Sequence, residues 1–122
     1  MRWSENFNQD ISAWNVSNVT KMSEMFWATT KFNANIGKWD VSKVTSMYNM
    51  FSEAESFNQD ISQWDVQQVK TMVGMFGEAK SFNQNISSWK VRSNTSYEKF
   101  TNESSVLKED VKPKRFQKLS QK

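Results

Sequence analysis

Four tryptophans recur along this chain at a fixed interval: Trp14, Trp39, Trp64 and Trp89 each stand 25 residues after the last. Tryptophan is a rare residue, so this interval indicates a repeated structural unit. Four other columns keep the same interval: Phe7, Phe32, Phe57 and Phe82; Asn8, Asn33, Asn58 and Asn83; Ile11, Ile36, Ile61 and Ile86; and Val16, Val41, Val66 and Val91. Units of this length bury their apolar residues against neighbouring copies. The 122-residue chain is therefore predicted to be one array of about four stacked units.

The apolar positions within a repeat follow two patterns, which the third copy, residues 57–81, illustrates. In its first half Trp64 and Val66 alternate with polar residues, and this period of two predicts a short strand. Its second half spaces apolar residues by three, three, one and three, as on one face of a helix: Val69, Met72, Met75, Phe76 and Ala79. Each repeat is therefore predicted to hold a short strand followed by a short helix.

The segment I-x-x-W-x-V-x-x-V has the spacing of the strand segment in leucine-rich repeats, L-x-x-L-x-L-x-x-N. We therefore expect an α/β fold, a right-handed leucine-rich-repeat-like solenoid with one short parallel strand and one short helix per 25-residue repeat. A β-helix without true helices is the alternative. Residues 1–100 are expected to form the four coils, and residues 101–122 a C-terminal cap and basic tail.

The tryptophan column is predicted to lie in the core, because the I-x-x-W-x-V register points Trp the same way as Val. Each indole N–H then needs a buried acceptor, either a turn carbonyl or the asparagine column. The alternative is a row of exposed rings on which sugars or bases stack. Carbohydrate binding through this column is therefore kept as a second functional hypothesis.

Two polar columns are also interpreted as structural. The asparagine column that begins at Asn8 follows the Phe at a turn, where an inward amide can satisfy backbone groups of its own coil and the next. The column formed by Asp10, Asn35, Asp60 and Asn85 is predicted to make Asx turns. Calcium binding is the alternative there, but adjacent copies carry Asn and no Gly-rich D-x-D-x-G loop is present. No metal site and no cofactor is therefore expected.

The residues between the inward positions change from copy to copy, whereas the inward residues repeat. Free of the packing constraint, these positions can carry specificity for a partner. The surface that they form is polar and mixed in charge, which suits a salt-sensitive protein interface. The predicted binding residues on this strand face are Lys38, Asp40, Gln63, Asp65, Lys90 and Arg92.

The composition removes several classes of function. The chain has no Cys and no His, which excludes thiol and imidazole catalysis, Cys/His zinc sites and disulfides. Paired carboxylates such as Asp40 and Asp65 could serve a hydrolase, but no second catalytic group accompanies them. The chain is therefore predicted not to be an enzyme. No apolar run approaches the roughly 20 residues that span a bilayer, so membrane insertion is not expected.

The string FNQDISxWDVSxVTxMxxMF resembles the 25-residue repeat of the DUF285, or BspA-like, bacterial surface proteins, a branch of the leucine-rich-repeat group. The resemblance covers residues 7–92. It fades in the fourth copy, where Asn94, Tyr97 and Phe100 replace Val and Met, as in a degenerate terminal unit. What the resemblance implies is a secreted or lipid-anchored repeat protein that acts in adhesion or protein binding.

The expected partner is another protein, from a host or from the bacterium. The resemblance places it outside the cell or at its surface. The chain shows no signal peptide, however, and Met1 stands in mid-repeat, so a fragment, a mature chain or a cytoplasmic member is expected. Such a start could also favour end-to-end self-association, or a role as a structural spacer. The basic residues after Asp110 are interpreted as a solvated tail, and nucleic-acid binding is not expected: Lys112, Lys114, Arg115, Lys118 and Lys122.

Overall fold

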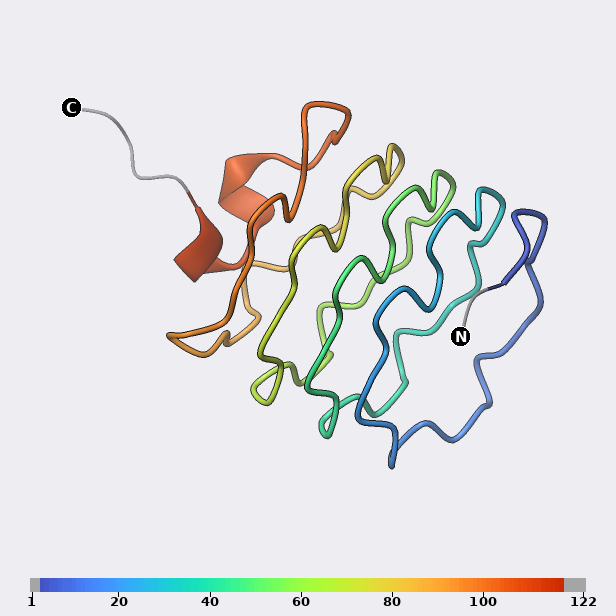
Figure 1. Cartoon of the computed structure of the whole chain (residues 1–122), viewed down its shortest axis with the longest axis horizontal. Coiled ribbons are helices and arrows are strands. Elements are labelled where there is room, and N and C mark those ends of the chain that lie inside the picture. The colour runs from blue at the N-terminus through green and yellow to red at the C-terminus, as the bar shows by residue number, and fades with distance from the viewer. Residues whose placement is uncertain (1–2, 118–122) are drawn as a thin grey trace.

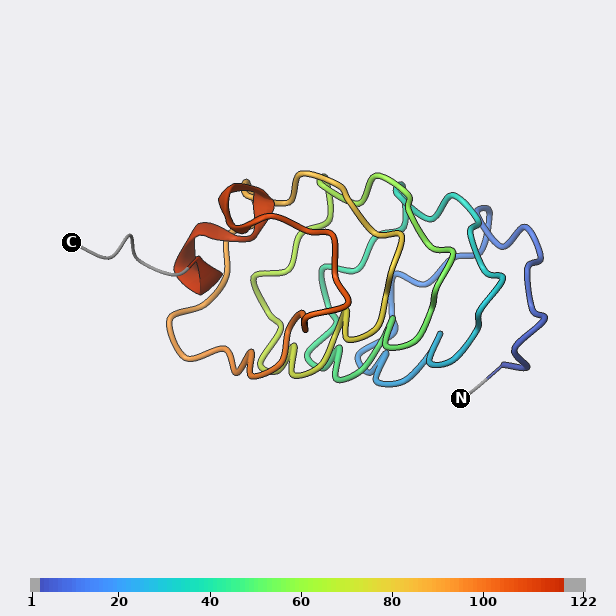
Figure 2. The ribbon, with the colours of Figure 1, turned by 90° about the horizontal axis from the view of Figure 1, so that it is seen from above.

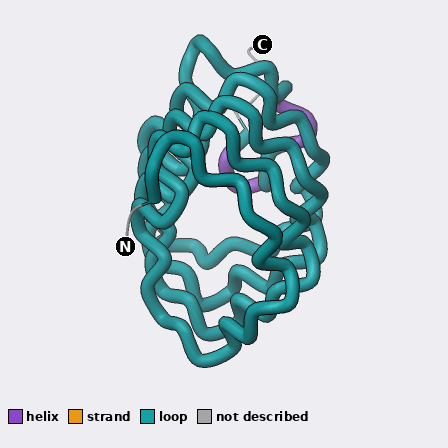
Figure 3. Tube along the Cα trace, turned by 90° about the vertical axis from the view of Figure 1, so that its right-hand side faces the viewer, coloured by secondary structure: helices purple, strands orange, loops and turns teal. Residues whose placement is uncertain are grey.

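The computed structural model describes residues 3–117 as four coils of the chain that lie side by side. Figure 1 shows the coils in sequence order from the N-terminal end to the C-terminal end, and Figure 2 shows the same order from above. Along the stack the coils follow nearly the same outline (Figure 3). The regular elements within the described residues are two short 3-10 helices that follow the last coil, η1 (Glu109–Val111) and η2 (Lys114–Phe116).

The expected α/β, leucine-rich-repeat-like fold is wrong. Between residues 3 and 117 the structure contains no α-helix and no strand in any repeat. The tryptophan–valine segment that was predicted as a strand consists of turns and irregular backbone. Parallel pairing occurs instead as single bridges in the segment predicted to be helical, and it joins Lys21, Ser46, Thr71 and Ser96. The repeated coils are therefore built from turns rather than from strands and helices.

The spacing of three between apolar residues is the spacing of the two ends of a β-turn. The amide of Trp14 donates to the carbonyl of Ile11 at 3.1 Å, and the same bond links Val19 to Val16 at 2.9 Å. These bonds recur one and two coils later, for example between Trp64 and Ile61 at 3.1 Å. A hydrogen bond from residue i+3 to residue i defines a β-turn, and both ends of each turn face the interior here. The pattern therefore resembles a helical face without forming a helix.

Positive φ angles show why the second half of each repeat cannot be helical. The turns there have the left-handed backbone at their third residue, as in type II turns. One column of such residues has φ between 52° and 68°, and a second column has φ between 57° and 61°: Glu24, Asn49, Gly74 and Lys99; Ala28, Glu53 and Glu78. An L-residue other than glycine loses roughly 1–2 kcal/mol in this conformation. Contacts between coils must therefore hold these turns.

A ladder of backbone hydrogen bonds between coils supplies that restraint. The amides of alternate residues in one coil donate to carbonyls 24 residues later. In the first step Met22 donates to Ser46 at 2.9 Å and Phe26 donates to Met50 at 2.9 Å. The second and third steps repeat the register: Met47 to Thr71, Asn49 to Val73, Phe51 to Met75, Met72 to Ser96, Gly74 to Glu98 and Phe76 to Phe100. All these N–H groups point toward the C-terminal end of the stack, so the ladder is directional.

Two columns of phenylalanine rings fill the core beside this ladder. Within one coil the rings of Phe26 and Phe32 lie 4.1 Å apart and nearly parallel. Between coils Phe26 stacks on Phe51 at 5.6 Å, and Phe32 stacks on Phe57 at 5.8 Å. Aromatic pairs of this kind add about 0.5–1.5 kcal/mol each beyond the burial of their surface. The core is therefore continuous from coil to coil.

Residues 106–117, here named the closing segment, pack against the fourth coil. The ring of Phe116 stacks on Tyr97 at 4.1 Å and meets Phe100 edge-on at 4.9 Å. The amide of Ile86 donates to the carbonyl of Val111 at 2.9 Å, so the closing segment also bonds to the backbone of the coil. Lys118 and Lys122 of the predicted tail lie outside the described residues.

Candidate functional site

Three of the four tryptophans in the column lie in the core, as predicted, and the prediction is wrong for Trp14. Trp39, Trp64 and Trp89 are each only 4% exposed. Their indole N–H groups donate to turn carbonyls of the preceding coil, which are those of Ile11, Ile36 and Ile61, at 3.0–3.1 Å. These three rings therefore cannot form a stacking surface for a sugar. Only Trp14, at 46%, is exposed among the four.

The asparagine column forms a ladder in which side-chain oxygens accept bonds from backbone amides, which confirms its structural role, but the side chains are exposed rather than inward as predicted. The amide of Asn33 donates to Oδ1 of Asn8 at 2.9 Å. In the following coils the amide of Asn58 donates to Oδ1 of Asn33 at 2.8 Å, and the amide of Asn83 donates to Oδ1 of Asn58 at 2.9 Å. The side chain of Gln59 adds a bond to Oδ1 of Asn33 at 3.1 Å. Each asparagine therefore links two coils.

The mixed Asp and Asn column makes Asx turns, as predicted. Oδ1 of Asp10 accepts bonds from the amide of Ser12 at 3.0 Å and from its hydroxyl at 2.7 Å. Equivalent bonds occur at Asn35, Asp60 and Asn85. Both serine bonds favour the charged carboxylate and lower the pKa of Asp10. Across residues 3–117 no cluster of three or more Asp, Glu, His or Cys could hold a metal ion.

The predicted binding residues fall on one face of the stack, here named the turn face: Lys38, Asp40, Gln63, Asp65, Lys90 and Arg92. The first five are exposed and Arg92 is half-buried. Lys38 and Gln63 lie in turns and the other four in irregular backbone, not in the predicted strands. A shallow hollow of about 310 Å³ brings Asp65 and Lys90 together with Gln67 and Ser88. Lys38 and Asp40 precede Gln63 and Asp65 by one repeat, and neither they nor Arg92 lines this hollow.

The two aspartates of the turn face have a structural role that sequence reasoning missed. Oδ1 of Asp40 accepts bonds from the hydroxyl and the amide of Ser42 at 2.6 and 3.0 Å, and these bonds lower the pKa of Asp40. Oδ1 of Asp65 accepts from the amide of Gln67 at 3.1 Å. The Asp-x-Ser spacing, already interpreted as an Asx turn in the first polar column, could have revealed this role. Lys90 replaces the carboxylate in the fourth coil, which changes the charge of the face there.

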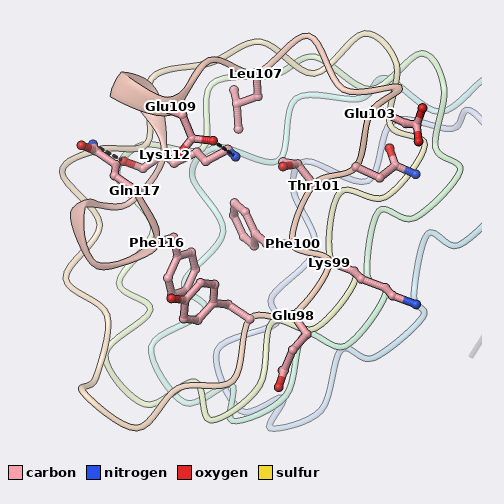
Figure 4. A pocket seen from close by; sticks show the side chains of 12 residues that line it. Glu98, Lys99, Phe100, Thr101, Glu103, Leu107, Glu109, Lys112, Phe116 and Gln117 are labelled. Atoms are coloured by element: carbon pink, nitrogen blue, oxygen red, sulfur yellow. Dashed lines mark hydrogen bonds and ion pairs between the residues drawn. The ribbon is translucent and has the colours of Figure 1, made fainter. Parts of the chain in front are cut away.

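A larger pocket, which was not predicted from the sequence, lies between the fourth coil and the closing segment. Its volume is about 630 Å³. Figure 4 shows Phe100 between Leu107 and Phe116 on the inner side of this pocket, with Glu98, Lys99 and Glu103 along its outer side. At its rim Nζ of Lys112 pairs with Oε2 of Glu109 at 2.5 Å. The pocket is here named the terminal pocket.

A comparison with known protein families identifies the family of this chain. The description "Mycoplasma protein of unknown function, DUF285" matches residues 1–113. The chain belongs to the DUF285 family. The DUF285 match therefore confirms the resemblance carried by the FNQDISxWDVSxVTxMxxMF repeat, and it extends into the closing segment. Neither a curated protein nor a solved structure matches the chain significantly.

The DUF285 description names no activity, so the function is argued from the surfaces described above. Among residues 3–117 no helix has the length and apolar character that crossing a membrane requires. Two surfaces offer a partner distinctive chemistry: the turn face with its variable charges, and the terminal pocket.

Proposed function

We propose that the chain is a non-catalytic scaffold that binds another protein through the turn face, in adhesion or protein interaction at a bacterial surface. The observation that carries this proposal is the contrast between two kinds of position. Buried columns keep one residue type in successive coils, whereas Lys38 is followed by Gln63, and Asp65 is followed by Lys90. Exposed positions that vary over a repeated core are what a binding surface on a fixed backbone requires.

The rigidity of the backbone supports binding without a large ordering cost. Each coil bonds to the next through backbone amides, asparagine side chains and indole N–H groups. The turns of the face are held in the second and third coils by Asp40 and Asp65, so the neighbouring Lys38 and Gln63 project from fixed positions. A preorganised surface loses less conformational entropy on association than a flexible one. The mixed charges suit a polar interface whose affinity falls with salt.

A structural role within a longer array is the second candidate. The exposed ring of Trp14 favours it, because the equivalent rings of the next three coils are buried against the coil before them. The first coil thus presents a surface that another coil could cover. Self-association in solution separates this candidate from a binding scaffold, and light scattering across a concentration series would detect it.

The test of the turn face uses charge reversal at lysines, since reversal at the aspartates would also break turns. The immobilised chain is exposed to a panel of extracellular proteins on a biosensor, and each saturable ligand is then titrated against variants. The double variant Lys38→Glu, Lys90→Glu should lower the affinity for a turn-face ligand at least tenfold. It should leave the unfolding curve of the chain unchanged. Lys31→Glu with Lys70→Glu makes the same change in net charge at exposed residues elsewhere, and it should leave the affinity unchanged.

Equal losses in both double variants would show that only net charge matters, and the turn face would not be the binding surface. No saturable ligand together with concentration-dependent growth of the particle would favour the array instead.

A further inference from the structure

The directional ladder ends in unused donors at the fourth coil. In the second half of each repeat, alternate amides donate to the coil after it, and Met72, Gly74 and Phe76 make the last of these backbone bonds, to Ser96, Glu98 and Phe100. One repeat later, the equivalent amides are those of Tyr97, Lys99 and Thr101. None of these three N–H groups donates a hydrogen bond within the described residues. They point away from the third coil, since the carbonyls of the same peptide groups face it.

These three residues line the terminal pocket. The pocket contains Tyr97, Lys99 and Thr101 in its wall, and a second hollow of about 360 Å³ at Thr95–Glu98 lies next to it along the same stretch of backbone. The apolar residues of the pocket are Phe100, which stands between two of the donor residues, and Leu107 and Phe116 of the closing segment. Figure 4 shows this arrangement of side chains around the open space. A row of backbone donors thus runs beside an apolar surface.

We propose that the terminal pocket binds an extended peptide segment of another protein. Carbonyl groups of alternate residues in the segment accept bonds from the amides of Tyr97, Lys99 and Thr101. One large apolar side chain of the segment contacts Phe100, Leu107 and Phe116. The segment adds one more rung to the ladder, as peptides add to the edge of a sheet in other recognition modules.

The chemistry of the site favours a peptide over a small anion. Donors at alternate residues are spread along the backbone, which matches the carbonyls of a chain rather than a single compact group. The pocket lining carries the carboxylates of Glu98, Glu103 and Glu109 against the ammonium groups of Lys99 and Lys112, and Lys112 is already paired with Glu109, so the charge around the donors does not attract an anion. A neutral backbone with an apolar side chain fits both walls of the pocket.

The closing segment makes a whole coil from a second copy a poor occupant. The ring of Phe116 stacks on the ring of Tyr97, and the Arg115 guanidinium donates to the carbonyls of Ser93 and Thr95. The amide of Ile86 already donates to the carbonyl of Val111. These contacts cover the end of the coil beside the pocket, where a stacked coil would have to sit. Only the stretch with the free donors stays open, and a single extended segment fits it.

The structure itself suggests a probe peptide. Residues 71–78, Thr-Met-Val-Gly-Met-Phe-Gly-Glu, present the carbonyls of Thr71, Val73 and Met75 to the second coil in the register that the terminal donors require. This peptide, acetylated and amidated, would be titrated into the full chain labelled with ¹⁵N. Saturable binding should shift the amide resonances of Tyr97, Lys99 and Thr101 and slow their hydrogen exchange. The amide of Phe100, already bonded to the carbonyl of Tyr97 at 3.0 Å, should change little in exchange.

A matched pair of variants isolates one donor. Thr101→Pro removes the backbone N–H, and Thr101→Ala removes the same side chain but keeps the N–H. Loss of one donor to a bound carbonyl should weaken the peptide about tenfold in Thr101→Pro relative to Thr101→Ala. Because the amide of Thr101 makes no bond within residues 3–117, both variants should keep the wild-type melting temperature. A Thr101→Pro variant that unfolds leaves the exchange pattern in the wild-type chain as the deciding measurement.

This inference is separate from the turn face, and its test separates the two. The Lys38→Glu, Lys90→Glu variant should bind the peptide as tightly as the wild type. The proposal fails if the peptide does not bind, or if it shifts turn-face amides instead. It also fails if the three amides are already protected from exchange in the free chain at low concentration, or become protected only as copies associate.

Discussion

The indole N–H of Trp39 donates to the carbonyl of Ile11, 28 residues earlier and one coil away, at 3.1 Å. That carbonyl also accepts the amide of Trp14, which closes the turn of its own coil at 3.1 Å. One oxygen thus joins a local turn to the neighbouring coil. The same arrangement recurs at Ile36 and Ile61. Turn formation and coil stacking therefore stabilise each other, which explains how coils built from turns can hold one backbone conformation.

Replacing a buried indole should show how much its hydrogen bond to the preceding coil contributes to stability. Trp64→Phe keeps an aromatic ring in the core but removes the donor to the carbonyl of Ile36 and leaves unfilled volume. We expect the free energy of unfolding to fall by about 2–4 kcal/mol, the sum of a lost buried hydrogen bond and a small cavity. Urea denaturation measures this change in the free energy of unfolding. The matched control is Trp14→Phe, where the exposed indole donates no hydrogen bond within the described residues, and where a change below about 0.5 kcal/mol is expected.

The asparagine ladder makes a second comparison possible within one column. Oδ1 of Asn58 accepts the amide of Asn83, whereas Oδ1 of Asn83 accepts no bond within the described part of the chain. Asn58→Ala leaves the amide of Asn83 without its partner, and we expect a loss of about 1–2 kcal/mol in the free energy of unfolding. Asn83→Ala should lose less than half of that. Equal losses in the two variants would show that the ladder does not hold the coils together.

Much of the molecule could be predicted from the period of 25 residues. The period identifies the stacked columns, the burial of Trp64, the Asx turn at Asp60 and the linking role of Asn33, because a residue repeated at one position of a stack meets its own copies. The secondary structure could not be predicted in this way. Apolar residues three apart occupy one face of a helix, and they also occupy the two ends of a β-turn, so spacing alone does not separate the two.

Two features of the structure could not be predicted from any pattern in the sequence. Glu24 and Glu53 adopt positive φ angles, although glutamate is not a residue that favours them; the ladder between coils imposes the conformation. The terminal pocket depends on how the closing segment places Phe116 against Tyr97, and this contact joins parts of the chain outside the repeat. Both features arise from tertiary contacts that a local pattern does not encode.

Stability should depend on pH through the Asx turns. Hydrogen bonds from Ser12, Ser42 and Ser62 lower the pKa of Asp10, Asp40 and Asp60 below the ordinary value of 3.8. Because the folded-state pKa is the lower one, the stabilisation is complete above 3.8 and is lost as pH falls from there through the folded values. We therefore expect the melting temperature to fall as the pH is lowered from 5 to about 2.

Asparagine at the same three positions provides the control for this pH effect. Asn35 and Asn85 already accept the equivalent bonds with a neutral oxygen that does not titrate. The triple variant Asp10→Asn, Asp40→Asn and Asp60→Asn should therefore show a smaller fall in melting temperature over the same pH range. An unchanged fall would assign the acid sensitivity to other carboxylates.

Glycine substitutions test whether the ladder imposes the left-handed turns. Gly74 has a φ of 68°, and a Cβ built there would lie 2.0 Å from Oδ1 of Asn49. Gly77, three residues later, has no left-handed φ, and its Cβ would meet its nearest neighbours at an ordinary 3.6 Å. Gly74→Ala should lower the free energy of unfolding by about 1–2 kcal/mol because of the strained backbone. Gly77→Ala should leave it unchanged or raise it by about 0.5 kcal/mol through the reduced entropy of the unfolded chain. If both variants were equally stable by urea denaturation, the turn at Gly74 would not be left-handed, and the register of the ladder would have to be different.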